Sequence, residues 1–110
     1  FSAGADLSAA IPLVAAGDRP GLLAAVANFQ SASMRIKYAQ VPVVAAVRGM
    51  CFGGGCEFQM HAAKTVAALE SYIGLVEAGV GLLPGGGGCK EFALRAAAAA
   101  VDGDVFTQLK

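Results

Sequence analysis

The stretch MCFGGGCE, residues 50–57, lies at the centre of the pattern from which the fold can be predicted. The apolar, β-branched run 41–47 leads into it, and the helical pattern 56–63 follows it. Three glycines and a carboxylate therefore mark a junction between a strand and a helix. Glycine lets a ligand approach the main chain closely, and the first N–H groups of a helix have no acceptor within the helix. The junction is suited to bind a developing negative charge, with Glu57 beside it.

The same stretch has a simpler interpretation. It would also fit a tight turn followed by an acidic residue that the helix dipole favours in the first turn. Both interpretations stay open from residues 50–57 alone. Two nucleotide-binding motifs fail, however: Lys90 is followed by Glu91, where a P-loop needs Ser or Thr, and Pro84 stands where a dinucleotide fingerprint needs its last glycine.

Composition limits the class of protein. The chain has 110 residues, no net charge, 56% hydrophobic residues and only 15% charged residues. It has no basic excess, so nucleic acid and anionic membranes are not expected as partners. Its three cysteines include no Cys-x-x-Cys pair, which argues against a zinc site and favours reduced thiols in the cytoplasm. The low charge predicts that residues 1–110 are an internal fragment of one domain, with its apolar surface covered by other parts.

The elements expected around the glycine turn 49–55 alternate between helices and strands, as in an α/β fold. Asp18 followed by Pro20 is typical of a helix start, and Pro42 ends that helix. We expect helices over 7–16, 18–40, 56–63 and 90–100, and strands over 43–47 and 65–69.

A second glutamate lies in an apolar segment. Glu77 is the only charged residue between Glu70 and Lys90. Its carboxylate lies either on an exposed edge or in a buried site, where burial would raise its pKa and suit it for proton transfer. By contrast, His61 lacks the partner histidine of a zinc motif and Cys56 lacks an identifiable base, so both are predicted to be structural.

Three segments resemble the crotonase (enoyl-CoA hydratase/isomerase) superfamily and occur in that family's order. FSAGADL at 1–7 resembles its first oxyanion-hole segment. PVVAAVRG at 42–49 with GGGCE at 53–57 resembles the second, and EAGVGLLPG at 77–85 resembles the segment with the second catalytic glutamate. The detail at 34–38 is most similar to the hydratase part of multifunctional 3-hydroxyacyl-CoA dehydrogenase/enoyl-CoA hydratase proteins.

The resemblance implies a fold of repeated ββα units, here a partial domain, and a soluble assembly of three or six copies. It also implies that the backbone N–H groups of Ala5 and Gly54 hold the thioester oxygen of an acyl-CoA. Leu7 corresponds to a position whose backbone meets the adenine of CoA. No metal or cofactor is implied, except NAD if a dehydrogenase domain is fused to this one.

The resemblance further implies a reaction. Glu57 and Glu77 would flank one water, which the N–H of Gly85 would help to hold, and the water would add across a trans-2-enoyl-CoA. Which glutamate is the base does not follow from the sequence. The loop after Pro84 is richer in glycine than the family pattern, which predicts a looser loop.

Two rival functions stay open. A Δ3,Δ2-enoyl-CoA isomerase would share the fold and the oxyanion hole but can work with one glutamate. A non-catalytic acyl-CoA-binding fragment would bind the thioester without turnover, although two carboxylates in apolar surroundings are costly to keep without a use.

Overall fold

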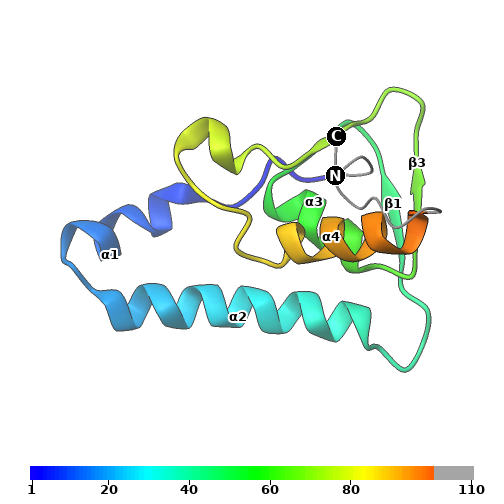
Figure 1. The fold of residues 1–110 in the computed structure, drawn as a ribbon. Coiled ribbons are helices and arrows are strands. Elements are labelled where there is room, and N and C mark those ends of the chain that lie inside the picture. Colours follow the sequence, from blue (N-terminus) through cyan, green and yellow to red (C-terminus); the bar gives the residue numbers. More distant parts are fainter. Residues whose placement is uncertain (101–110) are drawn as a thin grey trace.

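A computed structural model describes residues 1–100 of the chain, and it confirms the α/β class (Figure 1). Ten helices and strands follow one another: η1 (Leu7–Ala9), α1 (Ile11–Ala15), α2 (Arg19–Lys37), β1 (Val44–Val47), β2 (Met50–Phe52), α3 (Gly54–His61), β3 (Lys64–Ala67), β4 (Tyr72–Gly74), η2 (Glu77–Val80) and α4 (Gly88–Ala99).

The four strands within residues 1–100 form two parallel pairs. β1 pairs with β3, with Val44 opposite Lys64, and β2 pairs with β4, with Met50 opposite Tyr72. Each strand of the first ββα unit, β1-β2-α3, thus lies beside its counterpart in the next pair of strands, β3-β4. Ser2 adds a parallel bridge to Cys51, so the first residues extend the β2–β4 pair by one more chain segment.

The start of α2 has the predicted chemistry. The Asp18 carboxylate accepts a hydrogen bond of 3.0 Å from the N–H of Gly21, and Pro20 occupies the first turn. Gly17, with φ of +63°, ends the preceding helix in a conformation that other residues rarely adopt. Figure 1 shows α2 running along one side of the molecule, joined to α1 at one end.

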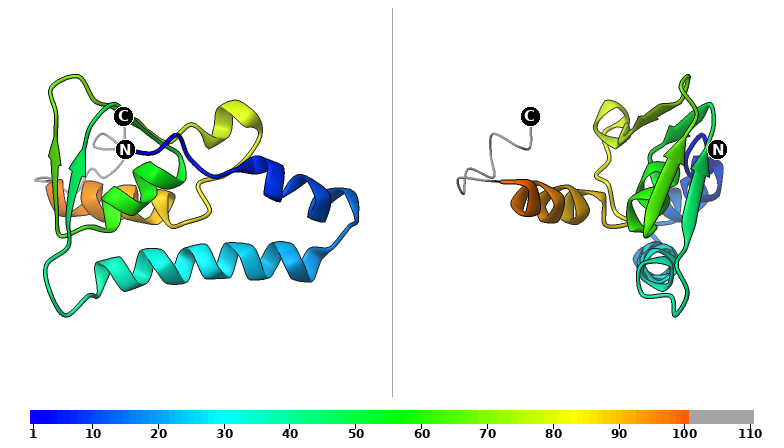
Figure 2. Two further views of the ribbon diagram at one scale, coloured as in Figure 1. Left: turned by 180° about the vertical axis from the view of Figure 1, so that it is seen from behind. Right: turned by 90° about the vertical axis from the view of Figure 1, so that its right-hand side faces the viewer.

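Helix α3 occupies the centre. It contacts α2, α4, β2 and β3, and in the side view of Figure 2 it lies between the strands and α4. The buried apolar cluster consists of Val47, Cys51, Cys56 and Met60, of which two come from α3. The N-terminus of α3 is therefore held by packing on several sides.

Two details of the strand prediction were wrong. The expected glycine turn 49–55 contains β2, because residues 50–52 pair with β4 before the glycines begin. The run 43–47 forms β1, but only Val47 is buried and Val44 is 56% exposed, because no described residue covers the outer face of the β1–β3 pair.

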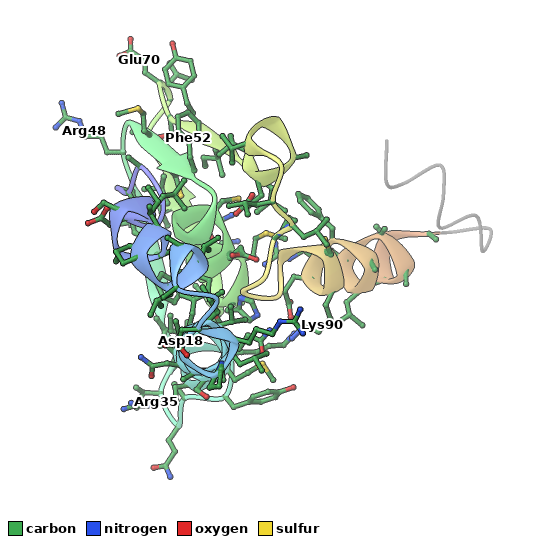
Figure 3. All side chains as sticks on the ribbon, turned by 90° about the vertical axis from the view of Figure 1, so that its left-hand side faces the viewer. Asp18, Arg35, Arg48, Phe52, Glu70 and Lys90 are labelled. Carbon is green, nitrogen blue, oxygen red and sulfur yellow. The ribbon has the colours of Figure 1, made fainter. Side chains whose placement is uncertain are left out.

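Several charged side chains lie at the periphery, in contrast to the buried Glu57 and Glu91. Arg35, Arg48 and Glu70 point outward from the fold (Figure 3) and are exposed. Within residues 1–100, no helix combines the length and the apolar composition that crossing a bilayer would need.

Candidate active site

The glycine turn presents the N-terminus of α3 to a cavity. Gly53 adopts φ of +52° and its N–H donates to the carbonyl of Gly74 at 3.0 Å, which ties the turn to β4. The N–H of Gly54, the first residue of α3, has no acceptor within residues 1–100, and the N–H of Ala5 has none either. One donor at the N-terminus of α3 and one from the segment before η1 thus line the same cavity and are free to bind an anionic oxygen.

Glu57 is the most buried large side chain of the described chain. It is 1% exposed, and its Oε1 accepts a hydrogen bond of 2.9 Å from the N–H of Gly88. Burial raises the pKa of the Glu57 carboxyl, and the nearby charge of Glu77 adds to the rise, while the backbone N–H of Gly88 opposes it. The raised pKa makes Glu57 better suited to hold and exchange a proton than an exposed glutamate.

Glu77 approaches the same region from η2. It is half-buried, and its Oε2 is a buried atom without a hydrogen-bond partner among the described residues. Its Oε1 lies close to Gly53, where an added Cβ would approach it to 3.0 Å. The structure thus brings Glu57 and Glu77, which are twenty positions apart in the sequence, close to the glycine turn. The Oε2 atom of Glu77 is available to a ligand.

One cavity of about 480 Å³ collects these groups. All six residues that the sequence singled out line it: Ala5, Leu7, Gly54, Glu57, Glu77 and Gly85. Most of the remaining lining is apolar and comes from α2, from residues 3–10 and from residues 76–86. A pocket with apolar walls and a few convergent polar groups is typical of a small-molecule site.

The glycine loop 85–88 is packed more closely than its composition predicts. A Cβ on Gly86 would come within 2.6 Å of Glu57 Oε2 and would also collide with the ring of Phe29. A Cβ on Gly88 would come within 2.9 Å of Leu75. The expectation of a looser loop was therefore wrong, because the glycines allow the main chain to approach Glu57. The carbonyl of Gly85 is held as well, by the side-chain amide of Gln30 at 2.8 Å.

Two parts of the site were not predicted. Phe29 of α2 lines the cavity, lies against both Gly54 and Gly86, and packs on Phe58 with ring centroids 4.8 Å apart. Gly88 supplies the N–H that binds Glu57. The helical spacing of apolar residues could have indicated that Phe29 packs inward. Nothing in the sequence near Gly88 indicates that its N–H binds a residue 31 positions earlier.

His61 and Cys56 have structural surroundings, as predicted. The Nδ1 of His61 lies 2.7 Å from the carbonyl oxygen of Glu57. A carbonyl only accepts, so Nδ1 carries the proton and donates it, one turn back along α3. Cys56 is 2% exposed, and burial raises the pKa of its thiol, which opposes formation of a reactive thiolate.

The burial of Glu57 predicts a stability that depends on pH. Its ordinary pKa is 4.5, and the folded state raises it. The contribution of Glu57 to stability is therefore fully present below pH 4.5 and is lost as the pH rises through the higher folded-state pKa. Glu57→Gln cannot ionise, so urea unfolding should show a smaller loss of stability for this variant over that pH range. Exposed Glu70→Gln is the control, and identical pH profiles for the Glu57 variant and the wild type would contradict the prediction.

Comparison with known proteins places these residues in a wider context. The enoyl-CoA hydratase/isomerase family model matches residues 1–104. A probable 3-hydroxyacyl-CoA dehydrogenase of Bacillus subtilis (strain 168) is 58% identical over 66 residues, which are 60% of this chain and 8% of that protein.

Two further relatives carry the name of a fatty acid oxidation complex. A putative fatty acid oxidation complex trifunctional enzyme of Rickettsia felis is 38% identical over 95 residues, 86% of this chain and 13% of that protein. The fatty acid oxidation complex subunit alpha of Colwellia psychrerythraea is 47% identical over 49 residues, 44% of this chain and 7% of that protein. The chain thus spans a small part of the length of the relatives it matches.

Proposed function

The chain belongs to the enoyl-CoA hydratase/isomerase family, and we propose that it carries the site of a hydratase that adds water across a trans-2-enoyl-CoA. The product would be a 3-hydroxyacyl-CoA. The observation that carries this proposal is the presence of two carboxylates, Glu57 and Glu77, in one cavity with the unpaired N–H groups of Ala5 and Gly54.

The N–H groups of Ala5 and Gly54 would stabilise the negative charge that the reaction creates. Attack of water at C3 moves electron density onto the thioester oxygen. Donors at Ala5 and Gly54 would bind that enolate oxygen, and the N-terminus of α3 adds its dipole. Because main-chain donors in a packed turn do not reorganise during the reaction, each can supply about 3 kcal/mol of stabilisation to the transition state.

Glu57 and Glu77 would transfer the two protons that move during hydration. One carboxylate takes a proton from the attacking water and the other delivers one to C2, so the pair needs two protonation states or a shared proton. The raised pKa of Glu57 and its electrostatic coupling to Glu77 support such a pair. Gly85, at the cavity wall, would hold the water by its N–H, and Leu7 would meet the adenine of CoA.

The reaction is neither oxidative nor reductive, so the hydration step itself needs no redox cofactor. From the names of the relatives, we infer that the site serves fatty acid oxidation within a longer protein. Acyl-CoA thioesters would be its ligands, and assembly into three or six copies in the cytoplasm stays a prediction.

Loss of the enoyl-thioester absorbance of crotonyl-CoA tests the proposal. We expect turnover by the whole protein that contains these residues, with the 110-residue chain measured beside it. If the whole protein leaves crotonyl-CoA unchanged but converts a 3-enoyl-CoA to its 2-enoyl isomer, the site is that of an isomerase. Calorimetric binding of an acyl-CoA without turnover of either substrate would leave a binding function only.

A further inference from the structure

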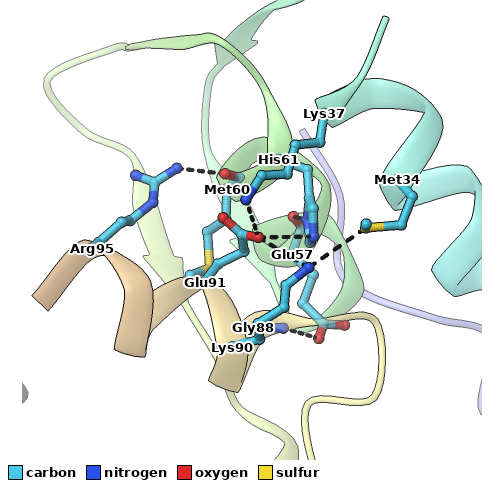
Figure 4. Close-up of polar contacts among 9 residues, drawn as sticks. All are labelled: Met34, Lys37, Glu57, Met60, His61, Gly88, Lys90, Glu91 and Arg95. Carbon is cyan, nitrogen blue, oxygen red and sulfur yellow. Dashed lines mark hydrogen bonds and ion pairs between the residues drawn. The ribbon is translucent and has the colours of Figure 1, made fainter. Parts of the chain in front are cut away.

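A second buried carboxylate lies outside the cavity. Glu91 of α4 is 4% exposed and does not line the cavity around Glu57. Its Oε1 lies 2.6 Å from Lys37 Nζ and 3.2 Å from Lys90 Nζ, as Figure 4 shows. The Nε2 of His61 faces the same oxygen at 3.6 Å. Burying a carboxylate is costly, so the two lysines bound to one of its oxygens indicate a site that the fold maintains.

This carboxylate joins the ends of three helices. Lys37 is the last residue of α2, His61 is the last residue of α3, and Glu91 lies in the first turn of α4. The strongest contact, Lys37 to Glu91, spans 54 positions of the chain. It therefore fixes the start of α4 relative to α2 and α3.

The start of α4 is also where Glu57 is held. Gly88, the first residue of α4, donates its N–H to Glu57 Oε1. The cap of this helix, Gly87, provides no side-chain hydrogen bond and has φ of +111°. Four successive glycines at 85–88 place few restrictions of their own on the backbone. The direction of the Gly88 N–H thus depends on the packing around the loop and on contacts made by the residues that follow it.

We infer that Glu91 is a positioning residue for Glu57: by binding Lys37, it fixes the first turn of α4 so that the Gly88 N–H points at the Glu57 carboxylate. The inference rests on the proposed function, in which Glu57 is a catalytic residue. Glu91 itself touches neither the cavity nor the substrate region and acts only through Gly88.

If Glu91 affected Glu57 through its charge alone, removing Glu91 would shift the Glu57 pKa in the direction opposite to that expected from positioning. The titratable groups that act on Glu57 are Glu77 from η2 and His61 from α3. Lys37 and Lys90 share the single carboxylate of Glu91, which offsets one of their two positive charges. If Glu91 is removed, the unpaired lysines would favour the ionised form of Glu57 and lower its pKa, whereas loss of the Gly88 hydrogen bond would raise it. In the Glu91 variants the sign of the pKa change separates positioning from direct electrostatics, whereas loss of Lys37 raises the Glu57 pKa by either route.

The test uses Glu91→Ala, Lys37→Met and the double variant, each in the whole protein. The pKa of Glu57 is measured by NMR with glutamate labelled with ¹³C at the carboxyl, and Glu57→Gln assigns the signal. We expect the Glu57 pKa to rise by about one pH unit in each single variant, which is the size of one hydrogen bond to a charged group. The double variant should raise the Glu57 pKa little beyond the single variants, because both changes break the same contact.

Kinetics supply the second readout. The variants should lower kcat for crotonyl-CoA by about tenfold and leave KM within about twofold, because one pH unit corresponds to a tenfold change in the proton equilibrium. Exposed Glu70→Ala is the matched control for loss of a carboxylate and should change neither quantity. Glu91→Gln keeps a hydrogen-bond acceptor for Lys37 and should give a smaller rise in pKa, and it serves if the alanine variant unfolds.

An unchanged or lowered Glu57 pKa in folded Glu91 variants overturns the inference. The NMR titration needs no turnover, so it tests the positioning of Glu57 even if the wild type hydrates no enoyl-CoA. In that case the proposed function fails while the inference about Glu91 is decided on its own measurement.

Discussion

Replacing Glu57 by glutamine is expected to lower the rate of crotonyl-CoA hydration by about 10²- to 10⁴-fold, the range typical of a lost general acid or base. Glutamine has nearly the same shape and keeps an oxygen that can accept the hydrogen bond from Gly88. The cavity and the oxyanion donors at Ala5 and Gly54 should therefore stay in place. The variant loses the proton-transfer capacity and one acceptor oxygen, which faces the Gly86 N–H, and the loss of proton transfer should fall on kcat.

The measurement is the initial rate of loss of enoyl-thioester absorbance in the whole protein at saturating substrate. Glu70→Gln is the matched control, because Glu70 is an exposed glutamate far from the cavity lining. The control should retain the wild-type rate. A rate for Glu57→Gln close to that of the control would show that Glu57 takes no part in the chemistry.

Replacing Gly86 by alanine is expected to cause the second large effect. The new Cβ would lie 2.6 Å from Glu57 Oε2 and would overlap the ring of Phe29, so the loop, the ring or the carboxylate must move. Overpacking a buried site costs about 1 to 3 kcal/mol of stability. A shift of about 1 Å in a catalytic group can cost about 100-fold in rate. We therefore expect both a lower midpoint of urea unfolding and a loss of hydration of about 100-fold.

The neighbouring glycine offers a matched control. A Cβ on Gly85 would meet only the carbonyl oxygen of Leu83, at an ordinary 3.8 Å, and neither glycine has a positive φ. Gly85→Ala makes the same chemical change one residue away and also keeps the Gly85 N–H. Because Gly85 itself lines the cavity, this variant is the control for stability, most of which it should retain. If the two alanine variants unfold at the same urea concentration, the close approach of Gly86 to Glu57 does not limit substitution there.

The site could be predicted in its local parts. The glycine turn followed by Glu57 predicts a carboxylate at a helix start, and α3 begins at Gly54. The isolated charge of Glu77 in an apolar segment left an exposed edge or a buried site open, and the structure places its carboxylate at the same cavity. Each of these predictions depends on chemistry within a few residues of chain, where capping, dipole and propensity act.

The contacts that bring these parts together could not be predicted in this way. The run 50–52 reads as part of a turn, yet it is a strand because β4 supplies its partner. The loop 85–88 reads as loose, yet it is packed because Phe29 and Glu57 fill the space that a side chain would need. Cross-strand pairing and close packing depend on residues far away in the sequence.

The α/β class, the helix start at Asp18, the glycine turn before Glu57 and the family can all be predicted from the order of the residues. The hydrogen bond from Gly88 to Glu57, across 31 positions, and the contact of Lys37 with Glu91, across 54, become visible only in the folded chain. The physical reason is the range of the forces involved. Helix capping and backbone preference act between near neighbours, whereas the environment of a buried carboxylate is set by every chain segment that excludes water from it.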